Sequence, residues 1–252
     1  MDAMSARTIR DAGTPDTAWL PWLAERGFPT ASMTDLCPGQ SRLVVIAPHP
    51  DDEILACGGL LAMRAQRGLA CLVVAVTDGE ASHAMGSPLT LARLGARRVE
   101  ESLAGLRALG VPSTFVARLG MPDGGTALLI DKIAQKLGAL LKPTDVVIST
   151  WRLDGHPDHE AVGEAATRAS AASGCRLLQA PVWMWHWAKP EDARVPWEAL
   201  AALNLTRDAI QAKQKALRCH LSQLEERTGG LGPVLIASIV ARVGRSQEHF
   251  FH

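Results

Sequence analysis

The sequence predicts an α/β fold of the Rossmann-like type, with a mostly parallel sheet and helices on both of its faces. From residue 42 onward, short apolar runs alternate with longer amphipathic segments, as they do in repeated βαβ units. The apolar runs are continuous, which is typical of strands buried on both faces. A glycine or proline follows the amphipathic segments, where helices are expected to end.

The predicted elements follow one another regularly as far as residue 174. Four buried strands are expected, at Leu43–Ala47, Cys71–Thr77, Thr114–Leu119 and Asp145–Thr150. Four helices follow them in turn, at Ile54–Arg67, Leu89–Leu109, Thr126–Leu141 and Asp158–Ala172. The residues that end these helices are Gly68, Gly110, Pro143 and Gly174. Because ligands of such sheets bind beyond the carboxyl ends of the strands, we expect the active site at that edge.

The chain after Arg176 is less regular. We predict a strand at Val182–Trp187, a helix at Arg207–Gln223 and a buried helix at Pro233–Val243, with an inert tail that contains His249. In the predicted strand, Trp183, Trp185 and Trp187 would share one face. That face could stack on a sugar ring, or it could be buried in the core or at a subunit interface.

The first forty residues are predicted to be an N-terminal extension to a catalytic domain that spans residues 41–252. Asp16–Glu25 carries a short helical pattern with tryptophans, and Pro29–Gln40 has the composition of a linker. The extension could cover the site or form an oligomer contact. The sequence is compatible with a homo-oligomer.

Composition narrows the class of protein. In a chain of 252 residues, 47% are hydrophobic, enough for a sizeable core. The 26 basic and 26 acidic side chains cancel, which argues against nucleic acid and anionic membranes as partners. The apolar runs are shorter than the ~20 residues of a membrane span. The five cysteines form no C-x-x-C pair, so we expect neither disulfides nor a thiolate zinc site, and a cytoplasmic location.

The first chemical motif is Pro48–Glu53, at the junction of the first strand and first helix. It holds one imidazole and three carboxylates, which would repel one another without a cation. Histidine and aspartate are suitable zinc ligands, and the spacing lets His49 and Asp52 converge while Asp51 points to the open side of the metal. An acidic helix cap is the alternative, but it leaves the histidine and the prolines unexplained.

The second motif, Asp154–His159, follows the fourth predicted strand. His156 and His159 bracket a Pro-Asp pair at the same edge of the sheet as the first motif. Together the motifs offer two histidines and an aspartate for one metal, with further groups for proton transfer. Three protein ligands and an open position are typical of a catalytic zinc. We therefore predict one Zn²⁺ per chain, although another divalent transition metal would also fit.

These two motifs resemble those of the PIG-L (LmbE-like) family of zinc-dependent N-acetylglucosaminyl deacetylases, which read A/P-H-P-D-D-E and H-P-D-H. The resemblance runs from about Leu43 to the C-terminus, and the first forty residues have no counterpart. Shorter matches support it, at Thr77–Glu80, at Arg98 with Glu101, at Leu119–Gly124, and at His220 with Ser222 and Gln223.

The resemblance implies that His49, Asp52 and His159 bind zinc, and that Asp51 is the general base. It gives His156 the role of steadying the oxyanion, with donation of a proton as a further role. The implied reaction removes an acetyl group from an N-acetylglucosamine-type sugar conjugate by means of metal-activated water. Either Asp51 or His156 would protonate the leaving amine.

Four further residues receive weaker predictions. Asp158 would orient a neighbouring imidazole, and a plain helix N-cap is an equally good reading. Asp123, Arg98 and Glu80 would line the substrate, although a turn-forming aspartate and an exposed arginine on a helix need no such role. The predicted partner is a small N-acetylated sugar conjugate. The alternatives are hydrolysis of another small amide, and a sugar-binding protein with a vestigial metal site.

Overall fold

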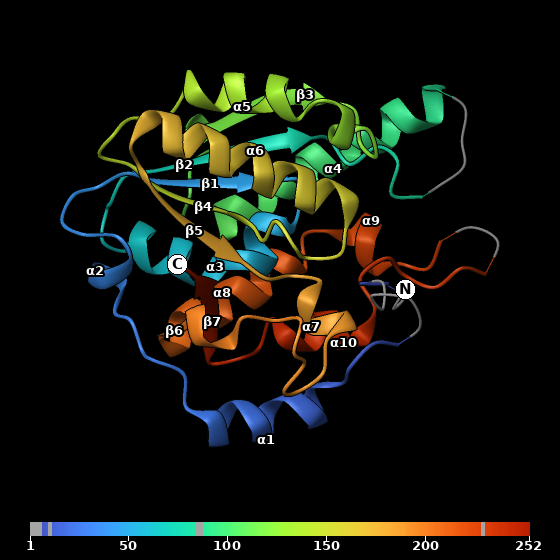
Figure 1. The fold of residues 1–252 in the computed structure, drawn as a ribbon. Helices are drawn as coiled ribbons and strands as arrows, with labels where there is room; N and C mark the ends of the chain where they lie inside the picture. Colours follow the sequence, from blue (N-terminus) through green and yellow to red (C-terminus); the bar gives the residue numbers. More distant parts are fainter. Residues whose placement is uncertain (1–6, 10–11, 84–87, 228–229) are drawn as a thin grey trace, which may run out of the picture.

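The computed structural model describes residues 7–9, 12–83, 88–227 and 230–252. In these residues seven strands form one sheet in the order β3-β2-β1-β4-β5-β7-β6 (Figure 1). Five strands are parallel: β1 (Leu43–Ala47), β2 (Cys71–Thr77), β3 (Val116–Met121), β4 (Val146–Thr150) and β5 (Arg176–Ala180). The edge is antiparallel and consists of β6 (Leu200–Asn204) and β7 (Gln247–Phe251).

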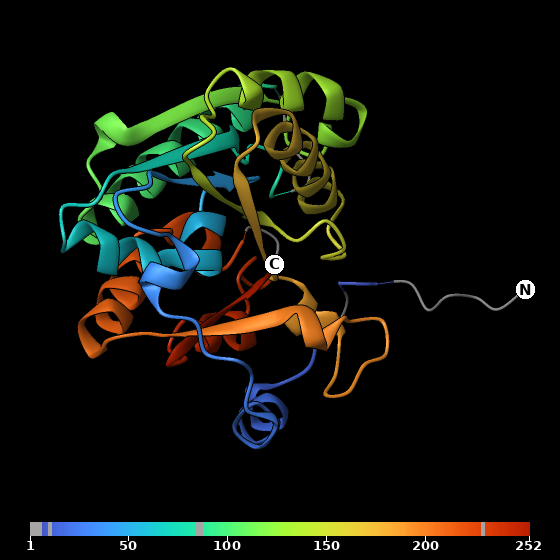
Figure 2. The same cartoon turned by 60° about the vertical axis from the view of Figure 1, so that its left-hand side comes forward.

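Helices cover both faces of the sheet, as predicted. The α-helices are α1 (Asp16–Arg26), α2 (Met33–Leu36), α3 (Asp52–Ala65), α4 (Pro88–Ala108), α5 (Ile130–Gly138), α6 (Pro157–Ser173), α7 (Met184–Trp187), α8 (Arg207–Leu217), α9 (Leu221–Leu224) and α10 (Ala237–Arg242). Short 3₁₀ turns lie at Ser113–Phe115, Thr126–Leu128 and Trp197–Ala199. Val45 belongs to a core cluster with residues of α3, α4 and α8, whereas Val44 and Ile46 belong to a cluster with residues of α5 and α6. Helices α3 and α8 lie on one side of the sheet, and α5 and α6 lie on the other (Figures 1 and 2). The alternation arises because successive side chains of a strand point to opposite faces.

The order of the strands places the carboxyl ends of β1 and β4 side by side. The chain runs outward from β1 to β2 and β3, and then returns to pair β4 with the other edge of β1. This reversal is the topological switch point at which such sheets bind their ligands. Both motifs therefore follow neighbouring strands, as the sequence predicted.

Three predicted helices are shorter in the structure, and one predicted strand is wrong. The buried helix expected at 233–243 is confined to α10, in which Ile239 is the buried residue. The helix expected at 126–141 divides at Leu129, whose φ of −124° is not helical, and the helix expected at 207–223 ends at Leu217. Residues 182–187 contain α7 rather than a strand. The backbone N–H groups of Val182, Trp183 and Met184 all donate to the carboxylate of Asp154, and an extended strand could not turn three successive groups toward one acceptor.

The predicted C-terminal tail is also wrong, because it forms β7 in the interior of the sheet. Glu248 and His249 are 3% and 5% exposed. The Glu248 carboxylate accepts the N–H groups of Gly59 and Leu60, next to the kink in α3 at Cys57. This polar sequence can be buried because the N–H groups of Gly59 and Leu60 satisfy the Glu248 carboxylate. These partners lie almost 190 residues away in the sequence, and no local pattern reveals them.

The N-terminal region packs against the last third of the chain (Figure 2). Trp19 of α1 is fully buried among other aromatic rings, and its indole N–H donates to the carbonyl of Trp185 at 2.9 Å. Further along, Ala31 donates to the carbonyl of Ala202 in β6, and Thr30 forms a bridge with the same strand. This segment thus covers the open edge of β6, which would otherwise expose unpaired backbone groups.

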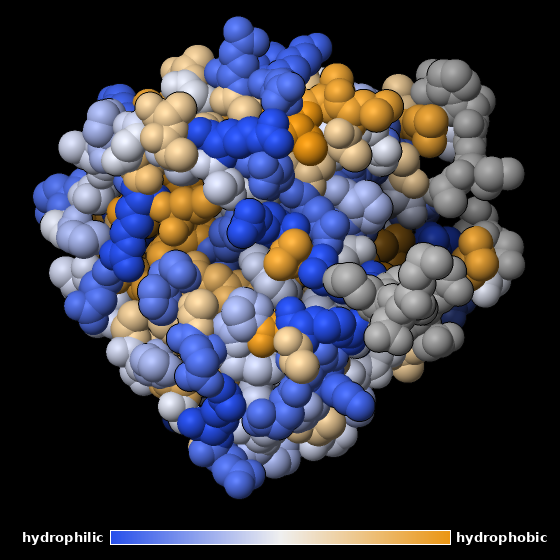
Figure 3. Space-filling view, viewed as in Figure 1, coloured by the Kyte–Doolittle hydropathy of each residue, from blue (hydrophilic) through white to orange (hydrophobic). Residues whose placement is uncertain are grey.

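The face shown in Figure 3 is dominated by hydrophilic and intermediate residues, and its apolar residues form separate patches. Most large apolar side chains belong instead to three buried clusters. Within the part of the chain that the structure describes, none of the helices combines the length and the apolar character needed to cross a bilayer.

Burial of His249 makes the stability of the protein depend on pH. Burial, with the charges of Arg245 and Lys213, lowers the pKa of His249 to about 3. Below its ordinary pKa of about 6.5, the unfolded chain binds a proton that the folded chain rejects, so the free energy of unfolding falls as the pH drops. For this group alone the loss between pH 7 and pH 5 is about 2 kcal/mol.

We expect His249→Gln to reduce this loss by that amount. Urea unfolding of both proteins at pH 7 and at pH 5 measures it, and taking the difference within each protein cancels any direct cost of the substitution. An equal loss in the two proteins would contradict the assignment.

Candidate active site and metal centre

The loop between β1 and α3 is held from the neighbouring strand. The N–H and hydroxyl groups of Thr77 both donate to the carbonyl of Pro48, at 3.1 and 2.8 Å. At the end of the loop, Asp51 has a φ of 135°, a conformation that an L-residue seldom adopts. Backbone strain of this kind costs about 1–3 kcal/mol and is often found at functional sites. The loop therefore sets the direction of the Asp51 side chain at an energetic cost.

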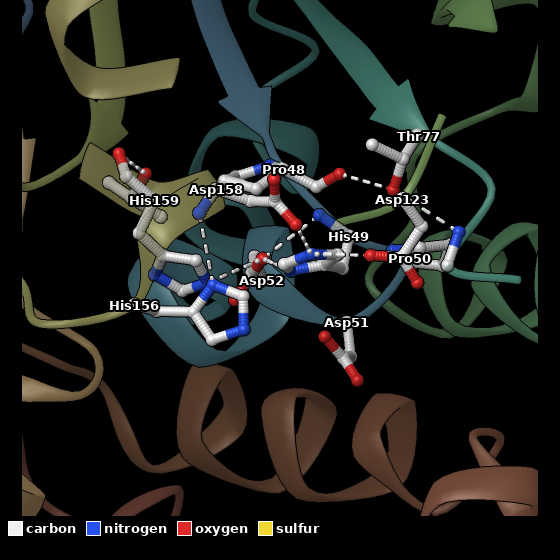
Figure 4. Close-up of polar contacts among 12 residues, drawn as sticks. Pro48, His49, Pro50, Asp51, Asp52, Thr77, Asp123, His156, Asp158 and His159 are labelled. Carbon is white, nitrogen blue, oxygen red and sulfur yellow. Dashed lines mark hydrogen bonds and ion pairs between the residues drawn. The ribbon is translucent and has the colours of Figure 1, made fainter. Parts of the chain in front are cut away.

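His49, Asp52 and His159 converge at the ends of β1 and β4 (Figure 4). Asp52 Oδ2 lies 3.1 Å from His49 Nδ1 and 3.1 Å from His159 Nε2. All three side chains are buried. The structure thus brings together the residues for which the sequence predicted metal binding, from motifs more than one hundred positions apart.

The outer nitrogens of both rings face carboxylates. His49 Nε2 lies 3.2 Å from oxygens of Asp123 and Asp158, and His159 Nδ1 lies 2.8 Å from Asp154 Oδ2. An imidazole that donates its outer N–H to a carboxylate directs the lone pair of its inner nitrogen toward the centre, as metal-binding histidines do. Each ring is thereby oriented, and its tautomer is set.

The resulting group fits a metal ion. His159 Nε2 is buried and has no hydrogen-bond partner in the described part of the chain, although it lies close to Asp52. Two donors at zinc–ligand distances of ~2.0–2.1 Å in a tetrahedral site are roughly 3.4 Å apart, close to the 3.1 Å of both pairs here. Ring nitrogens of His49 and His159 also lie within 4.8 Å of one on His156. A second set that could hold an ion combines His49 with Asp123 and Asp158.

The carboxylates around the two histidines also favour a cation at this point. Burial alone would lower the pKa of His159, but Asp52 and Asp154 outweigh it and raise that pKa to about 9. In the same way, neighbouring carboxylates raise the pKa of His49 well above its usual range, and the two imidazoles hold the pKa of Asp52 well below its own. Without an ion the rings must carry the positive charge as protons. A divalent metal would replace those protons, so its binding is expected to weaken in acid.

His156 has a different environment. Its Nδ1 accepts the N–H of Asp158 and so caps α6, which shows that the N-cap reading of Asp158 is wrong. Asp158 instead contacts His49 and accepts hydrogen bonds from Gly124 and Thr126. Burial and the charges of the other two histidines lower the pKa of His156 to about 3. The ring is therefore neutral, with its hydrogen on Nε2.

Arg98 lines the cavity of the site and also contacts the loop after β1. It is 2% exposed, so the alternative of an exposed arginine on a helix surface is wrong. Its Nη2 donates to Asp51 Oδ2 at 3.1 Å and to the carbonyl of Pro50, and its Nη1 donates to the carbonyl of Gly79. A Cβ atom at Gly79, where φ is +69°, would collide with this guanidinium. Arg98 thus holds Asp51 and its loop in place.

Glu80 and Asp123 connect the loops that follow β2 and β3. Glu80 Oε1 accepts the N–H of Asp123, and Asp123 Oδ2 accepts the N–H of Ala81. The other oxygen of Asp123 faces His49. Asp123 lines the cavity of the site, whereas Glu80 lines a separate surface groove.

The site opens into a cavity of about 310 Å³. The polar residues that line it are His49, Asp51, Asp52, Ser82, Arg98, Asp123, His156, Asp158, His159 and Gln223. Trp183, Val234 and Leu235 form an apolar wall. Asp51 extends to one side of the histidine cluster (Figure 4), so a small molecule in the cavity can approach both.

Asp154, for which the sequence predicted no role, is fully buried. Its carboxylate accepts three backbone N–H groups from residues 182–184 and contacts His159 Nδ1. Its position directly after β4, within the second motif, was the available signal. We infer that Asp154 orients His159 and, through that ring, ties the metal centre to the loop before α7.

We expect Asp154→Asn to weaken metal binding by about 10- to 100-fold, since an amide cannot replace the carboxylate as the charged partner of the ring. Titration with a chelator measures the affinity, and excess metal should restore much of the turnover. An unchanged metal affinity would show that His159 does not depend on Asp154.

Comparison with known proteins decides the family. Residues 44–170, half of the chain, match the PIG-L family, described as GlcNAc-PI de-N-acetylase. The chain belongs to the PIG-L family. A 1D-myo-inositol 2-acetamido-2-deoxy-α-D-glucopyranoside deacetylase from Tsukamurella paurometabola is 30% identical, over 73% of this chain and 83% of the relative. The resemblance inferred from the two motifs is thereby confirmed.

Two further proteins are similar to this member of the PIG-L family. A probable N-acetyl-α-D-glucosaminyl L-malate deacetylase from Bacillus anthracis is 27% identical, over 73% of this chain and 82% of the relative. The crystal structure of A40926 pseudoaglycone deacetylase superposes with a TM-score of 0.64, at 21% identity over 84% of this chain and 97% of that one. The structural likeness confirms the predicted fold.

Proposed function

We propose that this protein is a zinc-dependent hydrolase that removes the acetyl group from the nitrogen of an N-acetylglucosamine-type sugar conjugate. One observation carries the proposal. Two histidines and an aspartate direct electron-pair donors to one point, beside a cavity that a separate aspartate also lines. The curated relatives are named as deacetylases of such conjugates.

His49, Asp52 and His159 would hold the zinc ion, with one position left for water or substrate. When bound, the ion lowers the pKa of a coordinated water to about 7 and polarises the acyl oxygen. The outer carboxylates Asp123, Asp154 and Asp158 keep the two imidazoles in the orientation that this requires.

Asp51 is the proposed general base. Arg98 fixes one of its oxygens at 3.1 Å, which leaves the other for a water molecule in the cavity. Burial raises the pKa of Asp51 to about 7, even though the charge of Arg98 opposes the change. A carboxyl group balanced near neutrality can take a proton from water during attack on the acetyl carbon and give it up afterwards.

His156 is proposed to stabilise the oxygen that gains negative charge. Its Nδ1 accepts a backbone N–H, so its Nε2–H is the donor that can reach a ligand. Because its Nδ1 accepts a backbone N–H, and because burial lowers the pKa of the ring, His156 would carry no extra proton to transfer. We therefore assign protonation of the leaving amine to Asp51, which the sequence left open between these two residues.

The substrate would lie between the metal centre and the apolar wall. Asp123 can accept a hydrogen bond from a sugar hydroxyl, and Trp183, whose ring lies nearly parallel to that of His156, offers apolar contact to the sugar. Trp185 and Trp187 do not take part, since Trp185 is buried against Trp19 and Trp187 lies over Gly155. Arg98 and Glu80 act by positioning Asp51 and Asp123.

The test is a metal analysis combined with a screen for acetate release. The purified chain should contain one zinc and should deacetylate N-acetylglucosamine conjugates in preference to simple amides and acyl peptides. Better turnover of simple amides would favour a different amide hydrolase. A site without metal in carefully purified protein, together with sugar binding, would favour the binding-protein alternative.

A further inference from the structure

A second, smaller cavity lies behind the active site. It is bounded by α3, α8, α10 and β7, and Leu55 of α3 lines both this cavity and the catalytic one. Its volume is about 40 Å³. Because a water molecule needs roughly 10–15 Å³ by the same measure, the cavity suits a ligand about the size of three waters.

Basic side chains outnumber acidic ones in the lining of this cavity. Lys213, Arg242 and Arg245 line it, and their side chains are 5%, 8% and 7% exposed. The carboxylates that oppose them are Glu248 in the lining and Asp16 of α1. The charge of Asp154 also acts on Arg242, so within the described residues it is the hydrogen bonds of this cation that are incomplete.

Arg242 is the least closely paired of the three cations. Lys213 donates to Glu248 at 2.7 Å, and Arg245 donates to both oxygens of Asp16. Arg242 reaches Asp16 only at 3.8 Å through Nε. Of its nitrogens, only Nη2 donates a hydrogen bond, to the carbonyl of Thr14.

Two nitrogens of this guanidinium, Nε and Nη1, are buried and have no hydrogen-bond partner in the described part of the chain. Nε2 of His249, which also lines the cavity, is likewise buried without a hydrogen-bond partner among the described residues. Buried charged groups are costly unless hydrogen bonds satisfy them. Burial and the repulsion of Arg245 accordingly lower the pKa of Arg242 to about 10. A ligand that brought an acceptor and a negative charge would relieve both costs.

We propose that this cavity binds a small carboxylate monoanion of the size of acetate, with its oxygens on Arg242. The oxygens of a carboxylate would accept from the two guanidinium nitrogens of Arg242 that have no hydrogen-bond partner among the described residues. The volume suits an ion of about four heavy atoms. Ile239, Val243 and Val182 give the cavity an apolar side that accepts a methyl group. The site does not depend on the proposed reaction, although acetate released there would be one source of the ligand.

The experiment compares acetate binding to the metal-loaded full chain and to Arg242→Gln by calorimetry. Sodium gluconate, whose anion is too large for the cavity, keeps the ionic strength constant. We expect Arg242→Gln to weaken acetate binding roughly 10- to 100-fold at this site, the range expected for loss of a charge-assisted hydrogen bond. Any acetate bound at the metal centre should be unaffected, so the two sites are distinguished.

Arg67→Gln is the matched control, because it removes the same charge from an exposed position at the end of α3 and should leave binding unchanged. Asp16→Asn provides a second test that does not require the first variant to fold. It removes the carboxylate that competes for both guanidiniums, so acetate should bind more tightly.

A crystal structure grown with acetate should show the ion beside Arg242 Nη1. Three results would overturn the proposal: no acetate binding beyond that at the metal centre, equal binding by wild type and Arg242→Gln, or chloride binding as tightly as acetate.

Discussion

Asp51→Asn should lower the turnover of an N-acetyl sugar by about 10²- to 10⁴-fold while the protein keeps its metal. Asparagine has nearly the same shape and can still accept the hydrogen bond from Arg98, but it cannot take a proton from water. The metal should remain because His49, Asp52 and His159 are unchanged. Steady-state kinetics and metal analysis of the same preparation provide the two measurements.

Asp131→Asn is a suitable control for this variant, since it makes the same chemical change at an exposed residue of α5. Its turnover should equal that of the wild type. Full activity of Asp51→Asn would exclude Asp51 as the base. Loss of the metal together with activity would show instead that Asp51 belongs to the metal site.

Trp19→Ala should lower the free energy of unfolding by about 3–5 kcal/mol, the usual cost of removing a large aromatic side chain from a core. Trp19 is 0% exposed and lies within 5.0–6.0 Å, between ring centroids, of Trp22, Trp185 and Trp197. The substitution would leave a large void and also remove the hydrogen bond to the carbonyl of Trp185.

The neighbouring residue supplies the control. Leu20 is 51% exposed in the same helix, so Leu20→Ala should change stability by no more than about 0.5 kcal/mol. Urea unfolding measures both variants. A small loss for Trp19→Ala would mean that residues 1–40 are an extension to an independently stable domain, as the boundary predicted at residue 40 implies. A large loss would make them part of the same folding unit.

The sequence by itself determined the parallel part of the sheet and the convergence of the two motifs. Continuous β-branched runs, the helices between them and their glycine ends are local features, because they follow from backbone geometry and side-chain burial within ten to twenty residues. Given a parallel sheet, the ends of its strands must meet at one edge, so His49, Asp52 and His159 could be brought together without coordinates.

Only the tertiary structure decided which side chains support the site. From the sequence alone, Arg98 could have faced either solvent or substrate. Its burial against Asp51 depends on how α4 packs on the loop after β1. Asp154 turns toward His159 because the loop before α7 presents three N–H groups to its carboxylate. Such partners come from different elements, and no local pattern ties them together.

The antiparallel edge of the sheet and the packing of the N-terminal helix also depend on tertiary contacts. β7 pairs with β5 and β6 in antiparallel orientation. Its sequence is polar and resembles that of an exposed tail, although Glu248 is buried. Trp19 meets the carbonyl of Trp185 across 166 positions of the chain. Hydrophobic periodicity reports which residues are buried in an element but not what they are buried against, and that information arises only when distant segments pack together.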